Sequence, residues 1–429
     1  MIPTILDAAA RLRQREFSAS ELLEQCLSHI ERHEPRVRAW AYLDRDCARE
    51  DATRADDELR RGLDRGPLHG IPVGIKDIID VFDWPTACGS RRWTHAFARK
   101  DAPVVERLRR AGAVLVGKTV TTQYASFDPP PTRNPWNLNH TPGGSSSGSA
   151  AAIAAGMCLA TLGTQTGGSI TRPATYCGVA ACKPSHGTTS MAGVLPLAPS
   201  MDHIGPMART VAEVAIVLQT IAEGERNLLG LQEQPPRLAR PRGLFDRLAS
   251  PAVAAMVDRV CDELRAAGAQ VDDWELPPGF DELPHLQRVV MAVEAASYHE
   301  ARYRRHPDDY EPNFTSLLEE GLACPAPAFA RAKELQAQWR HLLGKMPLLV
   351  CPAATSPAPD ASTTGDPSFN APWSYLGFPL VSFPTALVDG LPIGIQIVGP
   401  AGRDRRVLAA AAWCERVLDV QLGNPRGLS

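Results

Sequence analysis

Short apolar runs alternate with amphipathic helical segments along most of this chain, and this alternation limits the folds it can adopt. In residues 70–81, Ile71, Val73 and Ile75 stand at every second position, as in a strand. Similar apolar runs lie at 113–116, 158–163, 348–351, 380–383 and 393–398. Segments with helical spacing separate them, at 147–156, 211–223, 252–268 and 407–420. The pattern predicts an α/β fold in which helices cover a sheet.

Three further regions complete the expected organisation. Residues 36–61 are charged and alanine-containing, which predicts a continuous helix, and 237–242 are expected to form a basic, proline-containing connector. Residues 281–345 predict amphipathic helix interrupted at prolines. No linker is long enough to force a boundary, so we expect a single domain over residues 1–429.

Charge and cysteine content exclude several classes of protein. The chain has 45 Lys and Arg against 48 Asp and Glu, a net charge of −3, which argues against a nucleic-acid partner. No stretch approaches the roughly 18 apolar residues of a membrane span, and the first residues do not resemble a signal peptide. The ten cysteines are scattered and form no metal-ligand block. We therefore expect a cytoplasmic protein with no membrane partner, no metal and no cofactor.

Three segments match catalytic or nucleotide-binding motifs, but we expect each of them to have only a structural role. Residues 112–119 match the phosphate-loop pattern, but the residues between its glycines are themselves the predicted strand. Ser146 stands in a nucleophile-elbow pattern, but the preceding 137–143 are loop rather than strand. His299 and the glutamate after it begin a zinc-protease motif that is incomplete, and we expect a solvated helix face there.

Lys76 is the first candidate for chemistry. Only 6 of the 45 basic residues are lysines, and this one lies inside an apolar strand. Burial disfavours the charged form, so its pKa should fall, and a neutral lysine is a competent general base where arginine is not. A structural ion pair with Asp77 is the alternative, although consecutive strand residues point to opposite faces.

Two Gly/Ser-rich segments are the other candidates. In 143–149 the glycines allow unusual backbone geometry, and we expect Ser147 and Ser149 to cap the helix that follows. In 163–169 a Gly-Gly turn can direct backbone N–H groups at an anion, as an oxyanion hole beside a nucleophilic serine requires. An ordinary turn is the alternative for this second segment.

Spacing connects these two segments. A helix of about eleven residues rises about 16 Å, and a returning strand of about six residues spans roughly 20 Å. A helix that starts near Ser147 and a strand that returns through 158–163 would bring Ser169 close to Ser145. A chain of Ser169, Ser145 and Lys76 could then work without a histidine.

At these residues the sequence resembles the amidase signature family. The matching segments are Gly70–Asp77, the Gly/Ser block from Gly143, the 24-residue step from Ser145 to Ser169, Arg172–Ala174, Asp202–Pro206, Gly377–Pro379 and Leu391–Gly399. The resemblance implies a single α/β/α domain with a large mixed sheet. It also implies that residues 223–343 form a variable, mostly helical region around the substrate pocket.

The resemblance implies a role for each site residue. Lys76 would be the base, Ser145 the bridging serine after a cis Gly144–Ser145 peptide bond, and Ser169 the nucleophile. The oxyanion hole would use the N–H groups of Thr166, Gly167, Gly168 and Ser169, and the supporting loop would be Gly143, Gly144 and Ser146. Ser169 would attack a carbonyl, an acyl-enzyme would form, the relay would protonate the amine, and water would complete hydrolysis.

Some positions depart from the family pattern. Gln165 stands where many members have Asp, and Thr171 stands where many have Arg. Arg172 instead comes three residues after the nucleophile, as in malonamidase-type small amidases. It would then hold a substrate carboxylate, or else form a structural ion pair, and both options stay open. Pro173 is expected to keep Arg172 out of a helix.

The lead hypothesis is an amidase that hydrolyses the C–N bond of a small-molecule amide or carbamate. The alternative is the A subunit of a tRNA-dependent amidotransferase, against which Gln165, Gln123 and the short C-terminus count. A catalytically silent binding module is opposed by the intact set of Lys76, Ser145 and Ser169, and an α/β-hydrolase based on Ser146 is the most distant option. A homodimer is an open option for the oligomeric state.

Overall fold

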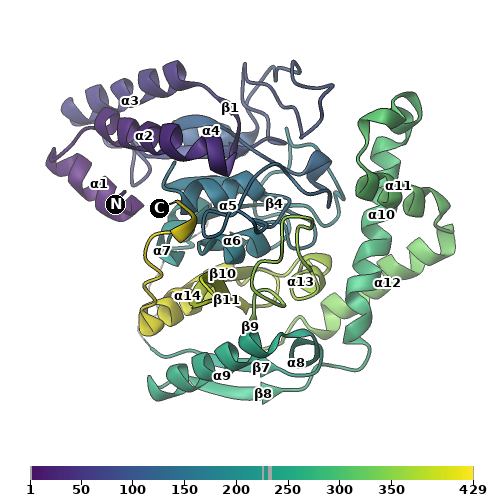
Figure 1. Ribbon diagram of the computed structural model, residues 1–429. Helices are drawn as coiled ribbons and strands as arrows, with labels where there is room; N and C mark the ends of the chain where they lie inside the picture. Colours follow the sequence, from purple (N-terminus) through teal and green to yellow (C-terminus); the bar gives the residue numbers. More distant parts are fainter. Residues whose placement is uncertain (1, 225–226, 230–233, 429) are drawn as a thin grey trace.

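The computed structural model describes residues 2–224, 227–229 and 234–428, and the strands of this part of the chain form one mixed sheet (Figure 1). Its order is β1-β3-β2-β4-β6-β5-β10-β11-β9-β7-β8. The strands are β1 (Trp40–Leu43), β2 (Pro72–Lys76), β3 (Val114–Thr119), β4 (Ala160–Gln165), β5 (Ala180–Lys183), β6 (His203–Ala208), β7 (Arg237–Pro241), β8 (Gln270–Trp274), β9 (Leu348–Pro352), β10 (Leu380–Val388) and β11 (Leu391–Val398). The predicted α/β fold with a large mixed sheet is confirmed.

Helices cover this sheet, and three of them stand to one side of it (Figure 1). The helices are α1 (Ile5–Gln14), α2 (Ala19–Val37), α3 (Arg45–Arg60), α4 (Pro103–Arg110), α5 (Ser147–Ala154), α6 (Thr171–Cys177), α7 (Val211–Ile221), α8 (Leu244–Leu248), α9 (Pro251–Ala266), α10 (Leu283–Arg305), α11 (Pro312–Ala323), α12 (Ala326–Leu342), α13 (Ala371–Tyr375) and α14 (Asp404–Leu418). α5 packs on β2 and β4, whereas α11 and α12 both pack on α10, which also packs on α13. In the described part of the chain, no helix combines the length and the apolar character that crossing a membrane requires.

The centre of the sheet explains where a site can form. β2 runs parallel to both β3 and β4, and every residue of these three strands is buried. Val73 pairs with Ala160 and Ile75 with Leu162, so β2 and β4 end at the same edge of the sheet. Side chains that follow parallel strands gather at their carboxyl ends, which is the usual place for a site in such a sheet.

Two local predictions are wrong, and in both cases strand pairing outweighs local pattern. The helix expected over 36–61 is broken, because α2 ends at Val37, Arg38 adopts a left-handed cap, and β1 pairs antiparallel with β3. The connector expected at 237–242 is strand β7, which lies parallel between β8 and β9 with Leu238 and Ala239 buried. β-propensity depends on context, so a short charged segment becomes a strand when its neighbours offer a ladder.

The prolines divide 281–345 as predicted. The segment forms α10, α11 and α12, with breaks near Pro307 and Pro325. The wider region 223–343 also contributes β7 and β8 to the sheet. Its long helix α10 contacts Thr166, the residue that follows β4, through Gln287, and it supplies one wall of the pocket described below.

Candidate active site

Lys76 ends β2 and is completely buried. Its Nζ lies 2.7 Å from Ser145 Oγ and 2.8 Å from Thr164 Oγ1. Asp77 turns the other way and pairs with Lys118 on β3, at 3.2 Å. The alternative in which Lys76 pairs with Asp77 is therefore wrong, for the reason that strand alternation suggests.

The electrostatic setting of Lys76 favours an uncharged amine. Burial lowers the pKa of Lys76 well below its usual range, and the negative charge of Asp202 opposes this shift only in part. A neutral amine keeps two N–H groups and one lone pair. It can therefore donate to Thr164 and accept the hydroxyl proton of Ser145, which is what a base requires.

Ser145 connects the lysine to the neighbouring loop. The Gly144–Ser145 peptide bond is cis, as the resemblance implies. The N–H of Ser146 donates to the carbonyl of Ser169 at 3.2 Å, so the two Gly/Ser loops pack directly on each other. The structure thus brings Lys76, Ser145 and Ser169 together at the edge where β2 and β4 end.

Close packing explains why the two residues before Ser145 are glycines. Gly143 has φ +80°, and a Cβ there would lie 2.8 Å from Pro173 Cα. A Cβ on Gly144 would lie 2.8 Å from a methyl carbon of Thr364. Any larger residue at either position would push the loop away from α6 or from Thr364.

The other serines of the loop have their hydroxyl groups engaged. Ser146 Oγ accepts from the N–H of Thr164 and donates to its carbonyl, both at 3.2 Å, which leaves no role for it as an elbow nucleophile. Ser147 Oγ donates to the carbonyl of Gly143 at 2.6 Å, and Ser149 Oγ to that of Leu162 at 3.2 Å. The predicted helix caps are therefore wrong: these hydroxyls satisfy buried carbonyl oxygens instead.

The loop that carries Ser169 is held from both ends. Gln165 Oε1 accepts from the N–H groups of Ile170 at 2.8 Å and Thr171 at 3.0 Å. Thr166 donates its hydroxyl to Asp202, a buried carboxylate that also accepts from two backbone N–H groups. Within the described chain, the N–H groups of residues 167–169 have no hydrogen-bond acceptor. They are free to hold an oxyanion.

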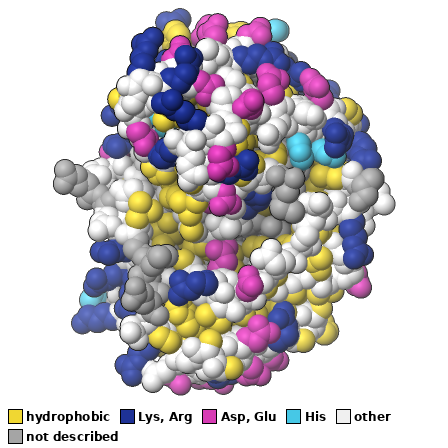
Figure 2. Space-filling view, turned by 90° about the vertical axis from the view of Figure 1, so that its left-hand side faces the viewer, with side chains coloured by type: hydrophobic (Ala, Val, Ile, Leu, Met, Phe, Trp, Pro, Cys, Tyr) yellow, Lys and Arg dark blue, Asp and Glu magenta, His cyan; other side chains and the backbone are white. Residues whose placement is uncertain are grey.

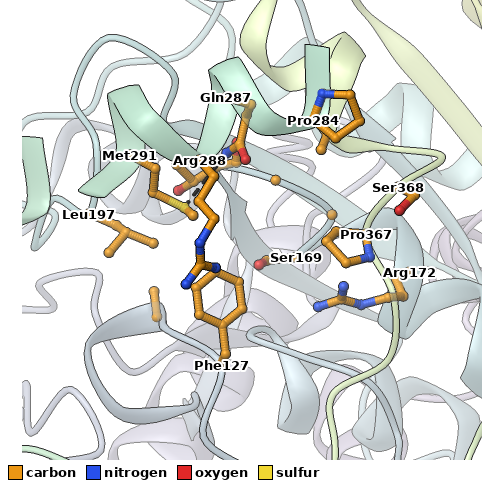
Figure 3. Close-up of a pocket in the computed structure, with 15 residues that line it drawn as sticks. Phe127, Ser169, Arg172, Leu197, Pro284, Gln287, Arg288, Met291, Pro367 and Ser368 are labelled. Atoms are coloured by element: carbon orange, nitrogen blue, oxygen red, sulfur yellow. Dashed lines mark hydrogen bonds between the residues drawn. The ribbon is translucent and has the colours of Figure 1, made fainter. Parts of the chain in front are cut away.

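A pocket of about 100 Å³ opens above this loop. Figure 3 shows Ser169 near its centre, Arg172 on one side, and side chains of α10 on the other. The α10 side chains are Pro284, Gln287, Arg288 and Met291, and Phe127, Leu197 and Pro367 add apolar surface. The pocket is small and largely apolar, and its polar groups come from the Ser169 loop, from two arginines, and from Gln287 and Ser368.

Arg172 lies inside α6, which corrects the expectation that Pro173 excludes a helix there. Pro173 falls in the first turn, where its missing N–H has no intrahelical acceptor to lose. Arg172 is 1% exposed, and its Nη2 donates to the carbonyl of Gly144 at 2.8 Å and approaches Thr364 Oγ1 at 3.4 Å. Its Nε and Nη1 have no partner among the described residues, so the structural ion pair is excluded.

The remaining motifs have structural explanations. Lys118 lies inside β3, buried, and donates to the carbonyl of Pro85 at 2.9 Å, so 112–119 is no phosphate loop. His299 is buried rather than solvated, which corrects the expectation of an exposed helix face. α11 packs on α10 there, and Phe314 and Tyr310 lie against the imidazole.

Sequence reasoning missed several residues that shape this site. Thr164 and Asp202 lie inside segments that carry the family resemblance, so the signal was present although no role was assigned to them. Gln287, whose Nε2 donates to the carbonyl of Thr166 at 3.1 Å, had no such signal. The amphipathic spacing of α10 does not indicate which of its residues reach a pocket on another segment.

A family model described as Amidase matches residues 21–408. The chain belongs to the amidase family. It is an amidase-signature hydrolase, an enzyme that acts on carbon–nitrogen bonds.

Similar proteins cover nearly the whole chain. The A subunit of a glutamyl-tRNA(Gln) amidotransferase from Roseiflexus sp. (strain RS-1) is 32% identical over 97% of this chain and 96% of its own length. A crystal structure of an amidase has 33% identity and a TM-score of 0.89, covering 96% of this chain and 99% of that one. The native peptide amidase from Stenotrophomonas maltophilia has 29% identity and a TM-score of 0.84, with coverages of 99% and 98%.

Proposed function

We propose that this amidase-family enzyme is a free-standing hydrolase of small amides that uses Ser169 as its nucleophile. One observation carries the proposal. A completely buried lysine, Lys76, lies 2.7 Å from the Oγ of Ser145, on a loop that packs against Ser169. This arrangement provides a base, a relay and a nucleophile in sequence, which activation of a serine requires.

The first half of the reaction forms an acyl-enzyme. Neutral Lys76 takes the hydroxyl proton of Ser145 while Ser145 takes that of Ser169, and Ser169 Oγ bonds to the amide carbon. The carbonyl oxygen becomes an oxyanion at the N–H groups of Thr166, Gly167, Gly168 and Ser169. The C–N bond then breaks, the nitrogen takes a proton back through Ser145 from Lys76, and the amine leaves.

The second half regenerates the enzyme. Water gives its proton to the same Ser145–Lys76 relay and attacks the ester carbon. The oxyanion collapses, the bond to Ser169 breaks, and Ser169 recovers its proton from the relay. The net change is one amide and one water converted to a carboxylic acid and an amine, with no metal or cofactor.

Arg172 supports a finer proposal about the substrate. Two of its guanidinium nitrogens, Nε and Nη1, are buried and unpartnered among the described residues, and the side chain lines the pocket beside Ser169. A buried donor without an acceptor is unfavourable, so a ligand oxygen there is stabilised. We propose that the acyl part of the substrate carries a carboxylate that Arg172 binds, as malonamidase-type enzymes would.

The Arg172→Ala protein is expected to lose roughly ten- to a hundredfold in kcat/KM on carboxylated amides, more than on neutral amides of the same length. The measurement is the ratio of kcat/KM for the two substrates. Arg288→Ala, which removes a guanidinium of the same pocket that already pairs with Glu320, should change this ratio far less. Equal losses on both substrates would show that Arg172 acts only through the carbonyl of Gly144.

A second candidate is supported by the 32% identity to an amidotransferase A subunit over 97% of the chain. Two positions favour the free-standing hydrolase instead. Gln123 is committed to structure, since its Oε1 accepts from the N–H of Glu311 at 2.8 Å. Gln165 both accepts from the Ser169 loop and donates to Ser374 at 3.1 Å, a pairing that an aspartate could not complete.

Activity of the isolated chain separates the two candidates. We expect the purified protein alone to release carboxylic acid from a panel of small amides and carbamates, because Lys76, Ser145 and Ser169 all lie in this one chain. An amidotransferase component would instead need its partner subunits and a charged tRNA for activity on its acceptor. A chain that is inert alone but active in such an assembly would contradict the proposal.

The proposal includes a small-molecule amide as the substrate, with no nucleic-acid partner and no membrane partner. On the face shown in Figure 2, basic and acidic side chains are intermixed rather than gathered by sign, which gives no basic track for nucleic acid. All ten cysteines are free, and eight are buried, which supports a reducing, cytoplasmic location. The proposal also includes a homodimer, and analytical ultracentrifugation of the purified protein would measure its oligomeric state.

A further inference from the structure

A second cavity, larger than the one at Ser169, lies elsewhere among the described residues. It measures about 530 Å³, against about 100 Å³ at Ser169, and lies further along α10. This open cavity is lined by residues from the segments 80–98, 193–195 and 298–305, and it shares no lining residue with the Ser169 pocket. We call it the Trp93 cavity. Its volume lies in the range of sites that hold a drug-sized ligand.

Aromatic side chains form its walls. Trp93, Phe97 and Tyr298 line it, and they are 40%, 53% and 52% exposed. Large apolar side chains that gather at one hollow indicate a binding surface, whereas scattered ones do not. The guanidinium of Arg302 lies 4.0 Å from the centre of the Trp93 ring and holds one face of the indole. The flat walls suit a planar aromatic ligand.

The charged groups of the cavity differ in whether they already have a partner. Arg302 is neutralised by Asp309, at 2.9 Å. Arg305 donates its Nε to the carbonyl of Ala301 at 3.1 Å, but in the described parts of the chain no carboxylate lies within ion-pair distance of it. Its terminal nitrogens can therefore form a bidentate pair with a carboxylate.

Two further polar residues of the lining, His299 and Asp80, limit which ligands the cavity can hold. His299 lines the cavity, its Nδ1 lies 3.1 Å from Tyr310 Oη, and its Nε2 has no partner among the described residues. Burial lowers the pKa of His299 to about 3, so the ring is neutral and adds no positive charge. Asp80 brings a carboxylate that makes no side-chain hydrogen bond to any described residue. A donor on the ligand would satisfy Asp80, whereas a second anionic group would be repelled.

We propose that the Trp93 cavity is a second ligand site, separate from the Ser169 pocket, for an aromatic monocarboxylate that carries a hydroxyl or amino donor. The carboxylate pairs with Arg305, the ring packs against Trp93, Phe97 and Tyr298, and the donor faces Asp80. The proposal stands on this cavity alone and does not depend on which amide the enzyme hydrolyses.

The test uses 6-hydroxy-2-naphthoate, a planar carboxylate with a hydroxyl donor, and titration calorimetry on the full-length Ser169→Ala protein. We expect one site. Added to that background, Arg305→Ala and Trp93→Ala should each weaken binding about tenfold or more. Both side chains are at least partly exposed, so the fold should survive. Arg304→Ala is the matched control, because Arg304 is the preceding residue of α10, exposed and paired with Glu300, and it does not line the cavity. Its affinity should be unchanged.

One comparison ligand and one further variant make the test decisive. 2-Naphthol, which lacks the carboxylate, should bind at least about tenfold more weakly, and the Arg305→Ala protein should no longer distinguish the two ligands. Absence of binding by 6-hydroxy-2-naphthoate would overturn the proposal. So would equal losses in the Arg304 and Arg305 variants, or loss of binding in Arg172→Ala, which would place the ligand in the Ser169 pocket.

Discussion

The Ser169→Ala protein is expected to lose amide hydrolysis by roughly 10⁶-fold in kcat, the loss that removal of a serine nucleophile brings in other hydrolases. The fold should be kept, because the contacts that hold this loop do not use the Ser169 hydroxyl. Its backbone carbonyl accepts from Ser146, and Gln165 and Asp202 hold the neighbouring residues. Steady-state rates and a circular-dichroism melt measure the two effects separately.

A covalent label tests the same assignment without a substrate. A fluorophosphonate should add to Ser169 in the wild-type protein and leave no adduct in Ser169→Ala, as mass spectrometry of peptides would show. Ser316→Ala, which removes an exposed hydroxyl on α11, should label and hydrolyse like the wild type. An adduct on any other residue, Ser146 included, would contradict the assignment of the nucleophile.

Replacement of Lys76 is expected to have the second largest effect. Lys76→Ala should lower kcat by about 10²–10⁴-fold, the usual contribution of a positioned proton transfer. Lys76→Arg should be no more active than Lys76→Ala, although it keeps a long basic side chain, because a guanidinium does not lose its proton at any relevant pH. Lys345→Ala, a change at an exposed lysine, is the control and should leave the rate unchanged.

Rescue by an added amine and the pH dependence of the rate test whether Lys76 acts as a base or has only a structural role. Methylamine should restore part of the activity of Lys76→Ala and act as its free base. In the wild type, the protonated ammonium cannot accept a proton, so the rate should rise as pH increases through the pKa of Lys76. Because burial lowers that pKa, this increase in rate should occur at a pH well below the range in which a free lysine titrates. A rise only in the range of free lysine would contradict the proposed relay, and so would inhibition by a chelator that zinc reverses.

Much of the site could be predicted because its parts are local. Lys76 was recognisable as a cation within one apolar strand, and the Gly/Ser segments 143–149 and 163–169 are short loops whose residues act through their own backbone. Only the helix and strand between them had to be inferred, and the observed α5 and β4 follow in that order. Periodicity and turn motifs involve residues close together in sequence and each implies a definite local geometry, so they can be interpreted from the sequence alone.

Residues whose role depends on distant neighbours could not be predicted in this way. The sequence left two roles open for Arg172, a hold on a substrate carboxylate or a structural ion pair. The structure shows that Arg172 donates to the carbonyl of Gly144, and that among the described residues it has two nitrogens without a partner and no ion pair. His299 looked exposed by its helical position, yet α11 covers it. Gln287 and the Trp93 cavity arise from α10 meeting loops roughly a hundred or more residues away in the chain.

Local patterns were sufficient to establish the α/β class, the division of 281–345 into helices and the candidate set of Lys76, Ser145 and Ser169. Periodicity and turn motifs are properties of residues that are neighbours in sequence, so they do not depend on contacts with the rest of the chain. Only the folded chain shows that 40–43 and 237–241 are strands, and what surrounds Arg172 and His299. Strand pairing and burial are contacts between segments far apart in sequence, so their energies are set only when the chain has folded.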